Sequence, residues 1–371
     1  MIVTRTARPA GLRPAGFALL LLLVAGTVLA YVYFTNKPEV PVDAGSGLRA
    51  YLDQQAGYLT LADGLTDRDG DLVADPPAAG FLHPDTLLFC EINTADPARD
   101  EERWQPFVDH LAKITGRKVQ YVKVLEPPAA KRDDEGSLPA TPAPASGALA
   151  ALATHVEALR AGRVHVTAFA TGSVPAAVNR GGFVPLFCPG DAAGKFGYEM
   201  EIVVKADSPV RTSGELRGRK VAFVGMTSNS GAKAPIVLLK EEFGLTAGRD
   251  YDFGFTGSHG KSLREVLSGS ADAACVANDL LGAETAAGRV KEGELRSVYK
   301  SSTFPPLCFG VKHDLAPALA AKVKEAFASF SALPTVYENT PGRVKFAPVH
   351  YKRDWAYVIE IDKRLRAVAA K

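Results

Sequence analysis

Apolar residues after residue 80 alternate between short continuous runs and stretches with helical spacing. The runs at residues 86–92 and 119–125 predict buried strands, and Phe107, Leu111 and Ile114 between them predict the apolar face of a helix. A strand, a helix and a second strand in this order predict a parallel sheet. The alternation continues with a helix at 148–161, strands at 164–169, 196–205, 221–224 and 271–277, and a helix at 315–330. The pattern predicts an α/β protein built on doubly wound, mostly parallel sheets.

The longest uncharged apolar run comes earlier, at residues 17–34, and the 16 residues before it contain arginines but no acid. Eighteen apolar residues are just enough to cross a membrane, and basic residues before such a segment stay in the cytoplasm. We therefore expect a cytoplasmic N-terminus at 1–16 and a membrane anchor at 17–34. A cleaved signal peptide, with a cleavage site at Val28-Leu29-Ala30, is the alternative. In both cases the body of the protein is periplasmic or otherwise extracytoplasmic.

Residues 35–80 have the character of a spacer and contain one acidic loop. Carboxylates stand at positions 1, 3, 5 and 9 of this loop, which are Asp67, Asp69, Asp71 and Asp75. This spacing resembles the D-x-D-G-D calcium loops of dockerin and thrombospondin-type repeats, since hard cations prefer clustered oxygen ligands. The acid expected at position 12 is replaced by Ala78. Calcium is the only cofactor that the sequence predicts, and a solvated acidic turn is the alternative.

A second segment without apolar periodicity lies within the body, at residues 126–147. It is rich in proline, alanine and charge, and is typical of a flexible insertion.

The stretch that follows the strand at 221–224 is typical of an anion-binding loop. Ser228, Asn229 and Ser230 are good helix N-cap residues, and Gly231 lets the backbone approach a ligand closely. A helix beginning here presents free N–H groups and the positive end of its dipole, and Lys233 adds a positive charge. Such a site suits a small phosphate-like anion. An ordinary solvated helix cap would have the same sequence.

Several motifs in order resemble the periplasmic phosphate/phosphite/phosphonate-binding proteins of ABC importers, a PhnD-like family. The matching residues are Trp104, Pro106, Thr115-Gly116, Lys118, Asp207-Ser208, Leu216, Gly218, Lys220, Ser228-Asn229-Ser230-Gly231, Gly257-Ser258-His259 and Asp272-Ala273-Ala274. The resemblance covers roughly residues 84–330.

The resemblance implies a two-lobe binding protein of the type II periplasmic class, which captures a phosphorus oxyanion for an ABC permease. Residues 81–204 and 299–371 would form the first lobe, and 205–298 the second. The implied ligand contacts are Ser228, Asn229, Ser230, Gly231, His259, Ser173 and Tyr198. Asp279 is added because it follows the end of a strand, where open α/β sheets bind ligands.

The segment at 303–308, which returns to the first lobe, contains no acid. Members of the family that bind aminoalkyl phosphonates offer an acid in this segment. An ammonium group in a closed cleft would then lack a partner. The expected ligand is therefore phosphate, phosphite or a small alkylphosphonate.

The net charge and the cysteines bear on nucleic-acid binding and on disulfide formation. A net charge of +2 without a basic stripe argues against nucleic-acid binding. The four cysteines, Cys90, Cys188, Cys275 and Cys308, lie in apolar runs and are expected as buried thiols, although one disulfide of undetermined pairing would form in an oxidising compartment.

Two other functions are compatible with the sequence. A serine hydrolase would use Ser230, His259 and either Asp272 or Asp279, but no G-x-S-x-G elbow is present. A membrane-anchored sensor or scavenger would use the same binding site as a transport protein.

Overall fold

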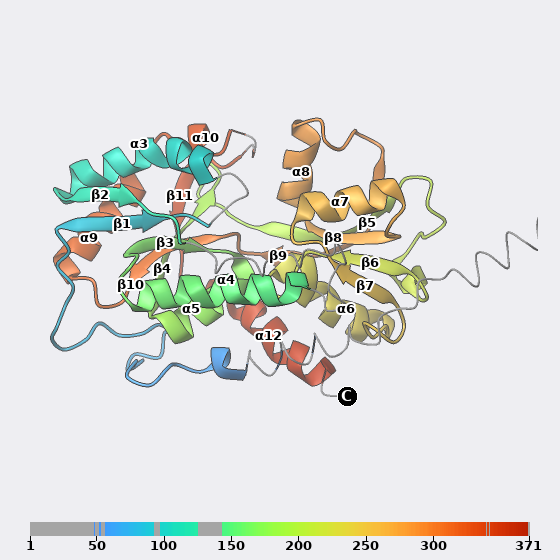
Figure 1. Cartoon of the computed structure of the whole chain (residues 1–371), viewed down its shortest axis with the longest axis horizontal. Helices are drawn as coiled ribbons and strands as arrows, with labels where there is room; N and C mark the ends of the chain where they lie inside the picture. The colour runs from blue at the N-terminus through green and yellow to red at the C-terminus, as the bar shows by residue number, and fades with distance from the viewer. Residues whose placement is uncertain are drawn as a thin grey trace, which may run out of the picture. The chain divides into compact units, whose positions relative to one another are not determined.

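The computed structural model describes residues 48, 52, 56–92, 97–124, 143–338, 340 and 342–369 (Figure 1). The predicted anchor at 17–34 and most of the predicted insertion lie outside these residues. Of the helices within the described ranges, none combines the length and the apolar character needed to cross a membrane.

The first lobe is organised around a six-stranded sheet of order β11-β4-β10-β3-β1-β2. β1 pairs in parallel with β2 and β3, whereas β10 runs antiparallel to β3 and β4, and β11 antiparallel to β4. The strands are β1 (Thr86–Cys90), β2 (Lys118–Tyr121), β3 (Val166–Phe169), β4 (Phe183–Gly190), β10 (Cys308–Lys312) and β11 (Lys345–Pro348). The helices of this lobe are η1 (Ala56–Leu59), α3 (Pro97–Thr115), α4 (Ala143–Arg160), η2 (Thr171–Ser173), α5 (Val174–Gly181), α9 (Pro317–Ser329), α10 (Leu333–Val336) and α11 (Tyr351–Asp354).

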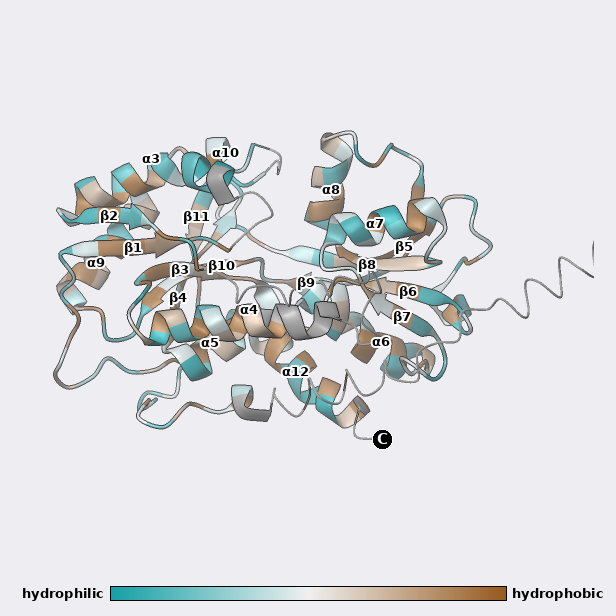
Figure 2. Ribbon diagram, viewed as in Figure 1, coloured by the Kyte–Doolittle hydropathy of each residue, from teal (hydrophilic) through white to brown (hydrophobic). Residues whose placement is uncertain are grey.

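Helices cover both faces of this sheet because its strands are apolar on both sides (Figure 2). One face packs against Phe107 of α3 and Phe327 of α9, through side chains such as Phe89 and Phe309. The opposite face, with residues such as Phe169, packs against α4 and α5. This arrangement follows from the period of two along a strand, which sends successive side chains to opposite faces.

The second lobe is organised around a five-stranded sheet of order β7-β6-β8-β5-β9. Val221 and Cys275 on one face pack with α6, and Ala222 and Val276 on the other pack with α7. The strands are β5 (Tyr198–Lys205), β6 (Lys220–Phe223), β7 (Asp252–Phe255), β8 (Ala273–Ala277) and β9 (Leu295–Phe304). The helices are η3 (Ser213–Leu216), η4 (Asn229–Lys233), α6 (Ala234–Phe243), α7 (His259–Ser268) and α8 (Asn278–Ala286).

Both sheets are mixed, so the prediction of mostly parallel sheets was wrong. In the second sheet β6 pairs in parallel with β7 and β8, but β5 runs antiparallel to both β8 and β9. Two of the strands that run against their neighbours, β5 and β10, directly follow the passages between the lobes. A strand that arrives directly from the other lobe, without a crossover helix, can enter the sheet in the opposite direction.

β5 and β9 both belong to the second sheet, so the chain changes sheets at 191–197 and again at 305–307. The predicted lobe boundaries at 205 and 299 differ from these positions, because an isolated strand pattern does not show with which sheet a strand pairs. The predicted domain limits otherwise stay a prediction.

Three segments differ from expectation in where they fold or pack. Residues 143–147, predicted within the flexible insertion, begin α4. The C-terminal tail, predicted on the first lobe, ends in α12 (Ala356–Ala369), which packs against α6 and η4 of the second lobe. Near the other end, the Ala62 N–H donates to Asn179 O at 2.7 Å, so the predicted spacer contacts α5 of the first lobe.

Candidate functional site

A cavity of about 660 Å³ is lined by residues of both lobes. The second lobe contributes the loop after β6, the start of α7 and the start of α8. The first lobe contributes Thr171, Ile92 and Arg343, together with the 306–307 passage. Most of these segments follow the end of a strand, which is the usual place for a ligand in an open α/β sheet.

The predicted anion loop forms one wall of the cavity. Ser228 has extended backbone geometry and caps the turn by accepting a hydrogen bond from Gly231 N at 3.0 Å. The following turn, η4, is π-helical and continues into α6, with Pro235 in the first turn of α6. Asn229 and Ser230 are buried and line the cavity. π-helical turns are rare and occur often at functional sites.

Gly231 supports this loop from behind. A methyl group at this position would lie 2.5 Å from Val224 Cβ, so only glycine fits. Gly231 does not line the cavity.

Lys233 does not face the cavity, contrary to the expectation that it would surround the anion. Its ammonium group donates to Asp362 Oδ1 of α12 at 2.8 Å and to Gly172 O at 2.7 Å. Both side chains are only 3% exposed. The charge of Lys233 is therefore used to join three segments of the chain.

The turn at 171–173 brings the first lobe against the anion loop. A side chain on Gly172 would lie 2.6 Å from Thr227 O and 2.8 Å from Asn229 N, so the two backbones touch here. Trp355 Nε1 donates to Thr171 O at 3.1 Å, and Thr171 Oγ1 donates to Pro305 O at 2.8 Å. These bonds fix Thr171 at the cavity. Ser173, which was predicted as a ligand contact, is buried behind it and does not line the cavity.

Tyr198, at the start of β5, reaches the same place from the passage between lobes. Asn229 Nδ2 donates to its hydroxyl oxygen at 3.2 Å, and the Asn229 Oδ1 atom is buried without a hydrogen-bond partner among the described residues. Burial raises the pKa of Tyr198, so its hydroxyl stays protonated and can donate. Asn229 and Tyr198 thus offer polar groups to a ligand in the cavity.

His259 begins α7, whose N-cap Ser258 accepts from Lys261 N at 3.3 Å. Burial lowers the pKa of His259 to about 4, against the opposing influence of Asp279 and Glu284. The imidazole is therefore neutral at physiological pH, and its buried Nδ1 has no partner in the described parts of the chain. A neutral imidazole can donate one hydrogen bond to an anion.

Asp279 stands in the first turn of α8 and accepts from Leu280 N at 2.8 Å. Its other oxygen forms an ion pair with Arg343 of the first lobe. Glu284, from the same helix, pairs with Arg289 at 2.7 Å.

The starts of η4, α7, α8 and the η2–α5 segment thus all lie at the cavity. Helix N-termini carry free N–H groups and partial positive charge, which favour a bound anion. Arg264, which also lines the cavity, has no ion-pair partner among the described residues. The cavity is thus suited to a small oxyanion held by neutral donors, by helix ends and by the charge of Arg264.

The cavity therefore brings together six of the predicted residues, which are Ser228, Asn229, Ser230, His259, Tyr198 and Asp279. Sequence reasoning missed Thr171, Arg264, Glu284 and Arg343. Arg343 follows a short helix and carries no motif, so only the fold could have placed it here.

The hydrolase alternative lacks its geometry. Asp272 lies away from the cavity, where it accepts from Lys220 N at 2.8 Å. Asp279 pairs with Arg343 and not with His259. Within the described ranges, no hydrogen bond joins Ser230 to His259.

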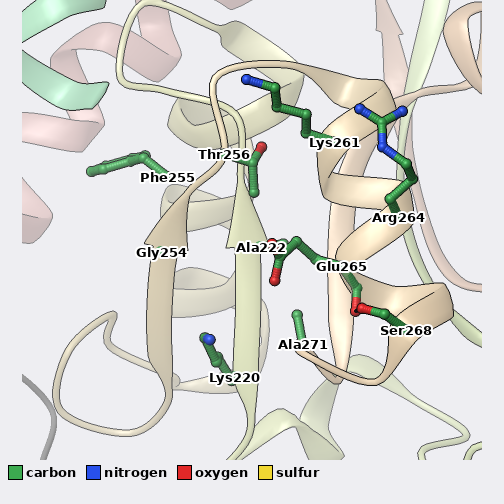
Figure 3. Close-up of a pocket in the computed structure, with 10 residues that line it drawn as sticks. All are labelled: Lys220, Ala222, Gly254, Phe255, Thr256, Lys261, Arg264, Glu265, Ser268 and Ala271. Carbon is green, nitrogen blue, oxygen red and sulfur yellow. Dashed lines mark hydrogen bonds between the residues drawn. The ribbon is translucent and has the colours of Figure 1, made fainter. Parts of the chain in front are cut away.

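A second cavity of about 500 Å³ adjoins the first through Arg264 and lies over β6, β7 and α7 of the second lobe (Figure 3). Lys261 and Arg264 stand near one end of it, and Lys220 at the other. Glu265 stands between them, so the charges are mixed. This cavity contains none of the residues that the sequence predicted for the site.

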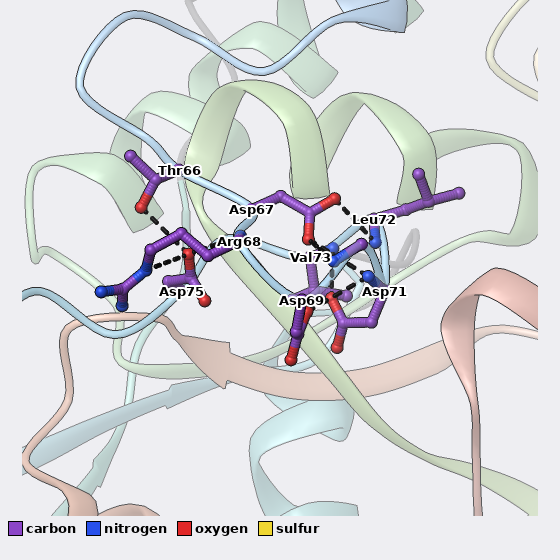
Figure 4. A network of polar contacts seen from close by, with 9 residues as sticks. Thr66, Asp67, Arg68, Asp69, Asp71, Leu72, Val73 and Asp75 are labelled. Carbon is purple, nitrogen blue, oxygen red and sulfur yellow. Dashed lines mark hydrogen bonds and ion pairs between the residues drawn. The ribbon is translucent and has the colours of Figure 1, made fainter.

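The acidic loop is held in place by hydrogen bonds from its own backbone N–H groups to its carboxylates (Figure 4). Ligand atoms of Asp67, Asp69 and Asp71 lie within 4.8 Å of one another. Asp75 is turned away from them, since it accepts from Arg68 Nε at 2.9 Å and from Thr66. Three of the four predicted ligands are thus together, and calcium binding at this loop stays a prediction.

Comparisons with known proteins also indicate a binding protein for a small oxyanion. The family model of periplasmic substrate-binding proteins of phosphonate ABC transporters matches residues 148–355. The phosphate-import protein PhnD of Mycolicibacterium smegmatis is 27% identical over 262 residues, which cover 68% of this chain and 73% of that protein.

Solved structures support the fold. PhnD1 from Prochlorococcus marinus, in complex with methylphosphonate, has a TM-score of 0.58 at 15% identity and covers 76% of this chain and 99% of its own. XAC2383 from Xanthomonas citri, bound to chloride ion, has a TM-score of 0.59 at 18% identity, with the same coverage of both chains.

Proposed function

Because the chain belongs to the family of periplasmic phosphonate-binding proteins of ABC transporters, we propose that it captures phosphate, phosphite or a small alkylphosphonate for import by an ABC permease. Members of this family are substrate-binding proteins rather than enzymes and act outside the cytoplasm, so the hydrolase alternative falls. The relative from Mycolicibacterium smegmatis is named as a phosphate-import protein, and the Prochlorococcus relative was solved with methylphosphonate. These names support a phosphorus oxyanion as the ligand class.

The observation that carries the proposal is the meeting of four helix starts at one cavity that also holds Ser230, Asn229 and a neutral His259. In this arrangement the oxyanion accepts hydrogen bonds from backbone N–H groups and neutral side chains. Contacts from both lobes would exclude water and strengthen these bonds. Capture and release require no covalent step.

The test is a thermal-shift and calorimetry panel on the full-length chain with phosphate, phosphite, methylphosphonate and sulfate. At a hundred times its dissociation constant, a true ligand should stabilise the protein by about 2.7 kcal/mol. We expect Ser230→Ala to lose this shift and Ser268→Ala, which lies outside the cavity, to keep it. Absence of a shift with every phosphorus oxyanion would refute the proposal.

A further inference from the structure

Two carboxylates line the candidate site, which is unusual for a cavity that binds anions. Both are paired with arginines. Glu284 pairs with Arg289 of its own lobe at 2.7 and 3.0 Å, whereas Asp279 pairs with Arg343 of the other lobe. Only the second pair therefore bridges the two lobes.

Arg343 is held firmly in this position. Its guanidinium carbon lies 4.9 Å from the centre of the Tyr337 ring, and Val344 N, the next residue, donates to Gly190 O at 2.8 Å. The side chains of Arg343 and Asp279 are 13% and 22% exposed. A cation that stacks on an aromatic ring and pairs in a largely desolvated place is attracted more strongly than at the open surface.

The same two residues also line a neighbouring cavity of about 380 Å³ near the passage between the lobes. Asp279 and Arg343 thus form part of the wall that the two cavities share. Both oxygens of the Asp279 carboxylate already have partners, since Leu280 N donates to one and the Arg343 guanidinium pairs with the other.

We infer that Arg343 is a specificity-determining residue, which neutralises Asp279 and thereby excludes phosphonates that carry an amino group. The inference rests on the proposed function and deepens it. An ammonium group entering the cavity would meet a carboxylate that is already paired and a guanidinium of like charge. A ligand with an uncharged alkyl arm meets neither obstacle, and it finds apolar surface at Leu280 and Leu307.

The experiment compares ligands of matched length on the full-length chain by calorimetry. Methyl-, ethyl- and propylphosphonate are measured beside aminomethyl-, 2-aminoethyl- and 3-aminopropylphosphonate. The measured quantity is the affinity ratio of each amino ligand to its alkyl partner, which a general loss of affinity or of lobe closure does not change. The variants are Arg343→Met, Arg343→Lys as the control that keeps the charge, and the double variant Arg343→Met with Asp279→Asn.

We expect the unaltered chain and Arg343→Lys to favour the alkyl ligands. Arg343→Met should shift the ratio toward the amino ligands by about tenfold or more, because it leaves a charged acceptor for the ammonium group. The double variant should lose that shift. An unchanged ratio in Arg343→Met, or an equal shift in the double variant, overturns this inference alone. Failure of every phosphonate to bind both the unaltered chain and Arg343→Met also overturns this inference. If phosphate and phosphite, measured beside them, fail to bind as well, the proposed function is overturned too.

Discussion

At the scale of single residues, burial and ion pairing decide which charges a ligand meets in the site. His259 is neutral, Tyr198 is protonated, and the ammonium group of Lys233 forms an ion pair with Asp362. The anion is consequently left to hydrogen-bond donors whose strength does not change between about pH 6 and 8. Among the buried groups that the structure describes near the cavity, Glu91, which precedes the cavity residue Ile92, is the one that titrates in this range.

Glu91 gives the first prediction. Burial raises its pKa from 4.5 to about 7, although Arg103 lies 3.0 Å away and Asp100 also pairs with that arginine. A carboxyl whose pKa is higher in the folded state stabilises the fold at low pH, and this contribution is lost as the pH rises toward 7. Glu91→Gln, which mimics the protonated acid, should remove this loss of folding stability with rising pH.

Urea unfolding at pH 5 and pH 8 measures this effect. Between these values the unaltered protein should lose about 2 kcal/mol of unfolding free energy more than Glu91→Gln does. Other groups, such as the buried His155, contribute equally to both proteins and cancel in the comparison. Parallel pH profiles for the two proteins would show that Glu91 is ionised in the folded state.

At the scale of elements, η2 of the first lobe packs directly against the backbone of the anion loop. Gly172→Ala adds a methyl group that would lie within 3 Å of Thr227 O and Asn229 N, and backbone atoms cannot move independently to make room. We expect phosphonate or phosphate affinity to fall by about tenfold or more, since a misplacement near 1 Å is costly in a preorganised site. Gly282→Ala is the matched control, because nothing lies within 4 Å of its added methyl group. Equal affinities in the two variants, measured by calorimetry, would contradict the prediction.

Strand register identifies the cysteine pair that sequence left open. Phe309 of β10 is paired with Phe187 of β4 in an antiparallel ladder, so Cys308 lies opposite Cys188. Opposed antiparallel residues have Cα atoms about 4.5–5.5 Å apart, which a disulfide can span. All four cysteines are buried thiols in the structure, as predicted.

In an oxidising compartment we expect a disulfide between Cys188 and Cys308 and none at Cys90 or Cys275. Peptide mass mapping of protein purified from an extracytoplasmic fraction, without reductant, tests this pairing. Cys188→Ser should remove the crosslink and Cys275→Ser should leave it. A crosslink that includes Cys90 would contradict the register argument.

Whether a feature can be predicted from the sequence depends on how far apart along the chain its interacting residues lie. The loop at 228–231 and the start of α7 were predictable because their chemistry is local, namely N-cap residues, a required glycine and a strand directly before them. The direction of β5 and the position of Arg343 were not, because pairing between distant strands and contacts across the cavity leave no local pattern. For the same reason the charge of Lys233 was expected beside the anion, since its partner Asp362 is 129 residues away.

At the scale of the whole described body, α12 joins the end of the chain to the anion loop. The Lys233–Asp362 pair is buried, and Lys233 also holds Gly172 O of the first lobe. Removing one member of a buried ion pair typically costs 3–5 kcal/mol, whereas replacing both by apolar residues is often nearly neutral. Variants of Lys233 and Asp362 separate this structural role from a role in binding.

Lys233→Met should lower the unfolding free energy by about 3 kcal/mol or more, because it removes the ammonium group that neutralises a buried carboxylate. The double variant Lys233→Met with Asp362→Leu should regain most of that loss in urea unfolding. If Lys233 acts only on the fold, the double variant should also bind phosphorus oxyanions within a few-fold of the unaltered affinity, since Lys233 does not line the cavity. A double variant that is stable but has lost binding by a hundredfold would instead place the lysine charge in the recognition of the anion.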